Sequence, residues 1–320
     1  MRRALLAVCA LGLSGAAFAG PGVRDLGGGA WLLPGTFTPG RQPDGNSILL
    51  RGPEGWVVVD TGRHAAHAQV ILEFIDAHPA PLVAVVNTHW HLDHVSGNAA
   101  LREKFPGLRV HAGAGIDAAL DGFLADSRRQ LVSLMEKSSD EAERQAMREE
   151  IARIDLGDKL KPDDVVQAGG EKILAGRALR FGLAAHAATE SDVWIFDAQQ
   201  KLLMAGDLVT LPAPFLDTAC APRWQAALGE LETLDFERLV PGHGEPLTRG
   251  QFAQYRKAFD GLLHCASTPA APSACAARWS SDAGSLLQGM DAGLTRGLIE
   301  YYVEYRLRGP KATSDCPAGS

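Results

Sequence analysis

Hydrophobic and polar positions in the first part of the chain predict a hairpin, a helix and a buried strand in that order. Two apolar runs, Ser47 to Arg51 and Trp56 to Asp60, flank the turn-forming stretch 52–55. Apolar residues then follow helical spacing over residues 64–78, until prolines end the helix. Leu82 to Val86 is a β-branched run typical of a buried strand.

A second group of strand patterns begins after residue 160. Short strands are expected at Val165-Val166, Ile173-Leu174, Leu179 to Leu183, Val193 to Phe196 and Leu202 to Ala205. Helices are expected over about 222–234, 249–264 and 284–307. Strands and helices therefore alternate in two halves, which favours two packed sheets with helices outside.

Residues 117–156 differ from both halves, because charged residues alternate with apolar positions such as Leu131, Leu134 and Ile151. This pattern predicts one or two amphipathic helices with a charged outer face. We interpret the segment as an insertion that flanks the mouth of a site. A packed peripheral helix pair fits the pattern equally well.

The N-terminus has the features of a secretory signal peptide. Met1-Arg2-Arg3 is positive, Ala4 to Leu13 is apolar, and Ala17-Phe18-Ala19 is a small-x-small cleavage site. Cleavage after Ala19 predicts a periplasmic or secreted protein. Val8 precedes Cys9 where a lipoprotein signal needs a small residue, and no later stretch has about 20 apolar residues, so no membrane anchor is expected.

These patterns divide the chain into three parts. Residues 1–19 form the signal peptide, residues 20–264 form one domain that carries the insertion at about 117–156, and residues 265–320 form a C-terminal helical extension.

The formal net charge of -7 argues against a nucleic-acid partner, which would require a basic surface. A small-molecule substrate is expected, and the oligomeric state is not predicted.

Cysteine usage agrees with export. Four of the five cysteines follow the predicted cleavage site, and an even number in an exported chain suggests two disulfides, with free buried thiols as the alternative. Three pairings are possible. We favour Cys265–Cys275, because the intervening segment is rich in Pro, Ser and Ala and closes easily. That pairing leaves Cys220–Cys316, which would tie the C-terminal tail to a loop.

The strongest chemical signal is His89-x-His91-x-Asp93-His94, which directly follows the buried strand at 82–86. Three imidazoles and a carboxylate within six residues suit a transition metal. Burying them without partners would cost roughly 1–3 kcal/mol per group. The sequence therefore predicts a metal site at this strand end.

Two weaker motifs also follow expected strands. Gly206-Asp207 ends the apolar run at 202–205, and Pro241-Gly242-His243-Gly244 follows Leu239-Val240. Taken singly, each is compatible with an ordinary turn. Taken with the histidine cluster, they form an ordered set of three strand ends that carry metal-ligand residue types.

This ordered set resembles the metallo-β-lactamase superfamily, whose pattern is His-x-His-x-Asp-His, a later His, an Asp and a final His. The similarity covers about residues 30–260, and Val59-Asp60-Thr61-Gly62 also resembles the family's strand before its first helix. The resemblance implies an α+β fold, namely a four-layer αβ/βα sandwich with metals at one sheet edge.

The resemblance also implies two divalent metal ions, with zinc expected and iron as the alternative. Asp60 is expected beside the metal loop rather than as a ligand. Carried over by motif, His89 and His91 bind the first ion, Asp93, His94 and His243 bind the second, and Asp207 bridges both.

One stretch departs from the family pattern, Gly-His-Thr-x-x-Asp. Aligning this chain on Thr189 and Asp192 places Ala188, not a histidine, at the third ligand position of the first ion. Aligning on His186 requires two extra residues before Asp192. Either His186 is the ligand through a bulged loop, or the first site lacks that ligand.

The implied activity is hydrolysis of an ester, lactone, thioester or amide by a metal-bound hydroxide that Asp93 orients. The segment Leu211 to Phe215 is expected to line the mouth of the site, and Trp90 is expected to pack in the core rather than flank a substrate. Three alternatives stay open: a β-lactamase, an iron-dependent oxidoreductase of the same fold such as a persulfide dioxygenase, and an exported protein that binds a metal or ligand without catalysis.

Overall fold

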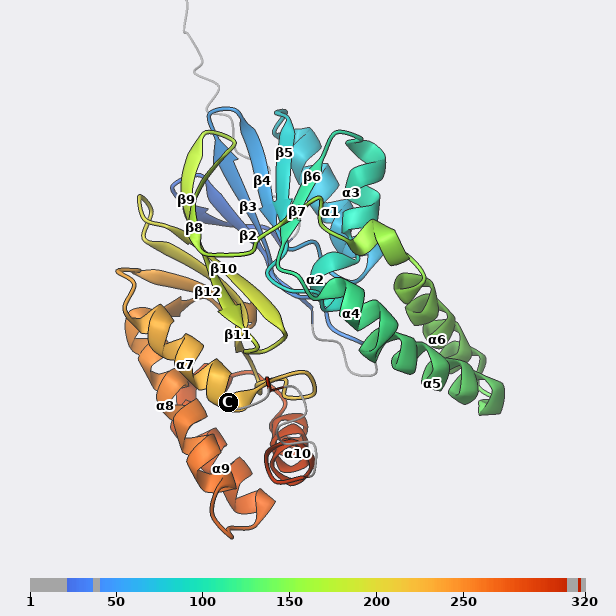
Figure 1. The fold of residues 1–320 in the computed structure, drawn as a ribbon, viewed down its shortest axis with the longest axis vertical. Coiled ribbons are helices and arrows are strands. Elements are labelled where there is room, and N and C mark those ends of the chain that lie inside the picture. The colour runs from blue at the N-terminus through green and yellow to red at the C-terminus, as the bar shows by residue number, and fades with distance from the viewer. Residues whose placement is uncertain (1–21, 37–40, 310–315, 318–320) are drawn as a thin grey trace, which may run out of the picture.

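The computed structural model describes residues 22–36, 41–309 and 316–317. The predicted signal peptide, 1–19, lies outside the described residues. Two sheets stack face to face with helices on both outer faces (Figure 1). This arrangement confirms the predicted four-layer αβ/βα sandwich.

The first sheet contains seven strands in sequence order. They are β1 (Arg24–Gly27), β2 (Ala30–Leu33), β3 (Ser47–Gly52), β4 (Gly55–Val59), β5 (Leu82–Val86), β6 (Arg109–Ala112) and β7 (Asp164–Val165). β3 and β4 form the predicted hairpin, while β4, β5, β6 and β7 run parallel. Parallel neighbours bring their carboxyl ends to one edge of the sheet, where the histidine cluster begins.

The second sheet contains six strands in the order β13-β12-β11-β10-β9-β8. They are β8 (Gly170–Leu174), β9 (Arg177–Ala185), β10 (Ser191–Asp197), β11 (Leu202–Thr210), β12 (Arg238–His243) and β13 (Leu247–Thr248). Its one parallel pair is β11 with β12. The Gly-Asp and Gly-His-Gly motifs therefore lie side by side.

Three apolar layers hold the sandwich together. Side chains between the sheets include Val57, Val86 and Met204, all buried. Outside the first sheet, α1 (Ala65–Ala77) and α3 (Asn98–Lys104) pack around Trp56. Outside the second, α7 (Ala221–Glu232) and α8 (Arg249–Ala266) pack around Trp224. The central strands of each sheet, such as β4 and β11, are thus buried on both faces, as their near-continuous apolar sequences require.

The charged segment at 117–156 is helical, as predicted. It contains α4 (Ile116–Asp121), α5 (Phe123–Lys137) and α6 (Glu141–Ile154), followed by the short 3-10 helix η1 (Gly157–Leu160). Asp140 caps α6 by accepting hydrogen bonds from the N–H groups of Ala142 and Glu143. The base of this insertion packs through Leu124 and Ile154 against Trp90, so it is anchored to the metal loop.

The C-terminal region is helical but more divided than the sequence predicts. The expected helix at 284–307 is instead a 3-10 helix η2 (Gly284–Leu287), α10 (Ala292–Tyr302) and a π-helical turn η3 (Val303–Leu307). Gly289 interrupts it at a φ of 80°, which breaks the helical hydrogen bonds. α9 (Pro272–Ala283) begins within the segment between Cys265 and Cys275, which is expected from its sequence to close easily.

Both favoured disulfides are present. Cys265 at the end of α8 pairs with Cys275 in α9, and Cys220 pairs with Cys316 across 96 residues of sequence. In the chain-entropy description, closing so long a loop stabilises the folded state by about 4–5 kcal/mol.

Among the described residues, no helix combines the length and apolar character needed to cross a membrane.

Candidate metal centre

Ionisable side chains from both halves of the sandwich converge at one edge. His89 follows the parallel strand β5, and the short helix α2 (Leu92–Val95) carries Asp93 and His94. Asp207 lies within β11 and His243 ends the neighbouring parallel strand β12. Each half therefore presents these residues near the carboxyl ends of a parallel pair.

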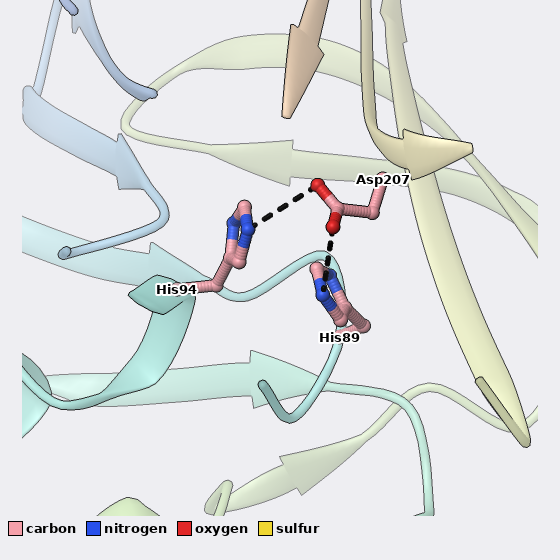
Figure 2. Close-up of side chains that lie close together, drawn as sticks. All are labelled: His89, His94 and Asp207. Carbon is pink, nitrogen blue, oxygen red and sulfur yellow. Dashed lines mark ion pairs between the residues drawn. The ribbon is translucent and has the colours of Figure 1, made fainter. Parts of the chain in front are cut away.

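Five of the predicted ligands form two overlapping groups whose potential ligand atoms lie within 4.8 Å of one another. One group is His89, His94 and Asp207, and the other is Asp93, His94 and His243. Figure 2 shows the first group, in which Asp207 Oδ2 lies 3.8 Å from His89 Nε2 and Oδ1 lies 3.3 Å from His94 Nε2. The two oxygens of one carboxylate thus face two different histidines.

The second group closes around Asp93. Its Oδ2 lies 3.0 Å from His243 Nε2 and 3.8 Å from His94 Nε2. His243 Nε2 is also 3.7 Å from Asp207 Oδ1. Asp207 Oδ1 therefore faces this group, while its Oδ2 faces His89.

His91 extends the first group, because its Nδ1 lies 2.9 Å from His89 Nε2. The other nitrogen of each ring, His89 Nδ1 and His91 Nε2, contacts a threonine hydroxyl whose own hydrogen is donated to a different acceptor. Thr88 donates to Asp60 Oδ2 and so accepts from His89 Nδ1, while Thr218 donates to the Ala188 carbonyl and so accepts from His91 Nε2.

This hydrogen bonding fixes the tautomers of the two rings. With Nδ1 of His89 and Nε2 of His91 protonated, two nitrogen lone pairs face each other at 2.9 Å. Burial, aided by neighbouring imidazoles, keeps the pKa of His89 well below its usual value, and burial lowers that of His91 to about 4. Neutral rings in this arrangement repel unless a cation lies between them.

Two buried atoms at the centre lack hydrogen-bond partners. They are His94 Nε2 and Asp207 Oδ1. Leaving such groups unpaired is costly, and imidazole nitrogen and carboxylate oxygen are common ligands of zinc and related ions. The donor set therefore fits metal ions at both groups.

Asp60 orients His94 through the ring nitrogen that faces away from the centre. Its Oδ2 accepts from His94 Nδ1 at 2.8 Å, and its two oxygens also accept from the N–H and hydroxyl of Thr88. Asp60 holds a φ of 58°, a conformation that Asp and Asn tolerate better than most residues. It thus lies beside the ligands, as the sequence predicts.

Charges within the centre hold the carboxylates ionised. Burial alone would raise the pKa of Asp93, but His94, His243 and Arg63 hold it well below its usual value. For His94, burial would lower the pKa, but Asp60, Asp207 and Asp93 raise it well above its usual value. The cluster therefore favours a positive charge at its middle.

Two glycines make this close approach possible. A Cβ on Gly242 would lie 1.9 Å from Asp207 Oδ1, and one on Gly45 would lie 2.4 Å from His94 Cε1. Any side chain at either position would push a candidate ligand out of place.

With this geometry in view, comparison with known proteins identifies the family. The model for the metallo-beta-lactamase superfamily matches residues 40–243, most of the chain. The chain belongs to the metallo-beta-lactamase superfamily. This result confirms the resemblance drawn from the motifs.

Two named relatives in the superfamily are hydrolases. The linear primary-alkylsulfatase of a Pseudomonas species is 24% identical over 219 residues, covering 62% of this chain and 41% of that protein. The hydroxyacylglutathione hydrolase of Nostoc punctiforme is 53% identical over 49 residues, covering 15% of this chain and 19% of that protein. The chain therefore spans less than half the length of these relatives.

Solved structures of the superfamily share the fold. The stereoselective inverting sec-alkylsulfatase from a Pseudomonas species aligns with a TM-score of 0.61 at 18% identity, covering 92% of this chain and 52% of that one. The metallo-beta-lactamase from Pontibacter korlensis aligns with a TM-score of 0.55 at 19% identity, covering 74% of this chain and 98% of that one.

The stretch that departs from the family pattern lies beside the first site. Asp192 accepts hydrogen bonds from the N–H and hydroxyl of Thr189, a contact that favours aligning these two residues with the Thr and Asp of the pattern, and that alignment would place Ala188 at the third ligand position. The Ala188 carbonyl reaches His91 through Thr218, so Ala188 lies beside the first site. His186 lies in the turn that follows β9, at a φ of 55°, and belongs to neither ligand group. Its role as a ligand stays a prediction that this geometry does not support.

The residues that surround the centre were in part predicted. Trp90 is buried against the insertion, and its indole donates to Glu190, in agreement with core packing. In the predicted mouth segment, the Phe215 ring lies 5.1 Å from the His91 ring, centroid to centroid. Leu211 and Pro212 line a large cleft that reaches His243.

Two long-range connections were not predicted. Asn46 donates to the carbonyls of Pro241 and Gly244, and so fixes the His243 loop to the first half. Arg63 contacts Asp93 Oδ1 at 3.4 Å and also pairs with Glu150 of α6, so the insertion reaches the centre through one guanidinium. Neither residue belongs to a recognisable motif, and their partners lie far away in the sequence.

Replacing Asp60 by Asn tests how His94 is oriented. Asn tolerates the same backbone conformation but removes the charge that holds His94 Nδ1–H. We expect zinc affinity to fall by about 10- to 100-fold, measured by competition with a chromophoric chelator. The matched control is Asp197→Asn, which removes a buried carboxylate that pairs with Arg177 outside both ligand groups. Equal zinc affinity in the two variants would contradict this role.

Proposed function

We propose that this protein is an exported hydrolase with a dinuclear zinc centre that cleaves an ester, lactone, thioester or amide bond. His89, His91 and Asp207 would hold the first ion, and Asp93, His94 and His243, together with Asp207, would hold the second. The observation that carries the proposal is the pair of facing nitrogens, His89 Nε2 and His91 Nδ1, 2.9 Å apart beside the unpartnered atoms of His94 and Asp207.

Zinc ions held by these residues would supply Lewis acidity and would lower the pKa of a bound water molecule toward neutrality. Asp93 provides an ionised carboxylate whose Oδ1 is held by Arg63 at 3.4 Å, with Oδ2 directed at the histidines. Such a group orients the attacking water and accepts its proton. Asp60 and the two threonine hydroxyls keep the imidazoles in the tautomers that bind a cation.

We assign Ala188 to the position of the third histidine of the family pattern, so two imidazoles and the Asp207 carboxylate would hold the first ion. Three protein ligands with one open position are typical of catalytic zinc. Asp93, His94, His243 and Asp207 would give the second ion four protein ligands, so we propose that this ion would bind more tightly.

Relatives favour two substrate classes. The hydroxyacylglutathione hydrolases support an acyl substrate, in line with the expected ester and thioester chemistry. The primary-alkylsulfatase, which matches this chain over 219 residues, supports a sulfate ester as the second candidate. Either substrate would be attacked by water activated at the same candidate centre.

Export to the periplasm or beyond is the proposed location. Two disulfides fit an oxidising compartment, which the signal-peptide pattern at 1–19 also indicates.

Metal content tests the ligand assignment. Mature protein loaded with zinc and then desalted is expected to retain two ions per chain, measured by inductively coupled plasma mass spectrometry. His91→Ala is expected to retain one, because it removes half of the imidazoles at the first site. His186→Ala is the matched control and is expected to retain two. Loss of an ion from His186→Ala would show that His186 is a ligand after all.

Activity tests the hydrolase itself. The zinc-loaded protein is expected to hydrolyse at least one member of a panel of p-nitrophenyl esters, lactones, thioesters, β-lactams and alkyl sulfates. Asp93→Asn is expected to lower kcat by about 10²- to 10⁴-fold, because it removes the proton acceptor. Rates are compared at equal zinc content, with Asp197→Asn as the control. An inactive parent with two bound ions would favour a non-catalytic metal-binding protein.

A further inference from the structure

A cleft of about 1260 Å³ opens beside the candidate metal centre. His243 and Gly244 form part of its wall, so it reaches the second ligand group directly. Cavities that bind small molecules measure about 300–1,000 Å³, so this cleft exceeds the space that a short ester needs. The extra volume lies between the insertion and the C-terminal helices, which project from the two halves on the same side of the sandwich (Figure 1).

Apolar residues from both sides line this extra volume. The insertion contributes Leu131 of α5 and Met147 of α6. Opposite them, Leu294 and Leu298 lie one turn apart on α10, so both point from the same face of that helix into the cleft. Leu294 is 38% exposed, one of few large apolar side chains that the described surface leaves open. Such a pair of walls would gain stability by taking up an apolar group.

Small residues keep the cleft open along α6. Ala142 and Ala146 lie one turn apart on its exposed surface and line the cleft. Longer side chains at these positions would reach toward α10. Ala152, also exposed on α6, does not line the cleft.

Most charges in the wall are already paired. Arg153 contacts Glu149 and Glu150, and Asp44 contacts His64. Arg41 donates to His64 Nε2 and forms no ion pair within the described part of the chain. The wall thus offers a single positive group without a carboxylate partner and a broad apolar surface, which together suit an amphiphile rather than a highly charged ligand.

We propose that the cleft binds the long apolar chain of the substrate, such as an acyl or alkyl chain, with its reactive bond at the His243 end. This inference rests on the proposed hydrolase function and adds the class of substrate. It predicts that kcat/KM rises with chain length. The physical reason is that each CH₂ group buried between α6 and α10 is removed from water.

Chain-length dependence in matched variants tests the cleft. In the zinc-loaded full-length mature protein, kcat/KM is expected to be at least tenfold higher for p-nitrophenyl dodecanoate than for p-nitrophenyl acetate. Ala146→Trp, which fills the cleft from an exposed helix position, is expected to lower that ratio at least tenfold. Ala152→Trp introduces the same ring on the same helix outside the cleft and is expected to leave the ratio unchanged.

A binding measurement separates the cleft from the catalysis. Fluorescence titration with 11-(dansylamino)undecanoate is expected to show saturable binding that Ala146→Trp weakens at least tenfold and Ala152→Trp does not, while dansylglycine, which lacks the chain, does not bind. Probe binding without hydrolysis of any ester would support the cleft and contradict the hydrolase. Hydrolysis with no chain-length preference and equal probe affinity in both variants would overturn the cleft and leave the hydrolase intact. Ala146→Trp could also change the sedimentation coefficient while leaving the dodecanoate-to-acetate ratio of kcat/KM unchanged. That result would overturn the proposed chain-binding cleft, because it would show that a second copy of the protein covers this face.

Discussion

The structure depends on one electrostatic constraint: imidazole and carboxylate groups are buried together, with nitrogen and oxygen atoms that face one another at short distances. His89 Nε2 and His91 Nδ1 face each other because threonine hydroxyls hold the opposite nitrogens as donors. Asp207 Oδ1 and His94 Nε2 lie 3.3 Å apart without other partners. Such an arrangement is unfavourable in a dry interior unless cations occupy it. The glycines at 45 and 242, and the strained backbone of Asp60, serve the same close approach.

The fold meets this constraint by using both halves of the sandwich. Parallel pairs β4–β5 and β11–β12 end at the same edge, so short loops from distant parts of the sequence meet there. Asn46 and Arg63 then connect the halves and the insertion to these loops. The rigid sheets position the ligand residues, while the insertion and α10 shape the approach to them. The loops at the sheet edge thus carry the candidate metal ligands, while the outer helices shape the cleft that leads to them.

Much of this was predictable from the sequence, for physical reasons that differ by element. The hairpin at β3–β4 and the strand before His89 carry strong local patterns, and the histidines that follow are too closely spaced to be buried at low cost without a metal. The break at Gly289 was missed, because a single glycine within an amphipathic pattern need not end a helix. Contacts such as Arg63–Glu150 depend on how a long insertion folds back, which no local pattern encodes. The expectation that His186 is a ligand stays a prediction: its residue type fits the motif, while its turn does not bring it into either of the two ligand groups.

Anomalous diffraction at the zinc absorption edge, from crystals of the zinc-loaded mature protein, tests the central claim most directly. The account predicts two anomalous peaks, one beside His89 and His91 and one beside His94 and His243, with Asp207 contacting both. It also predicts no peak at His186. Absence of any peak within the cluster, or a peak bound by His186 in place of the Asp207 bridge, would contradict it.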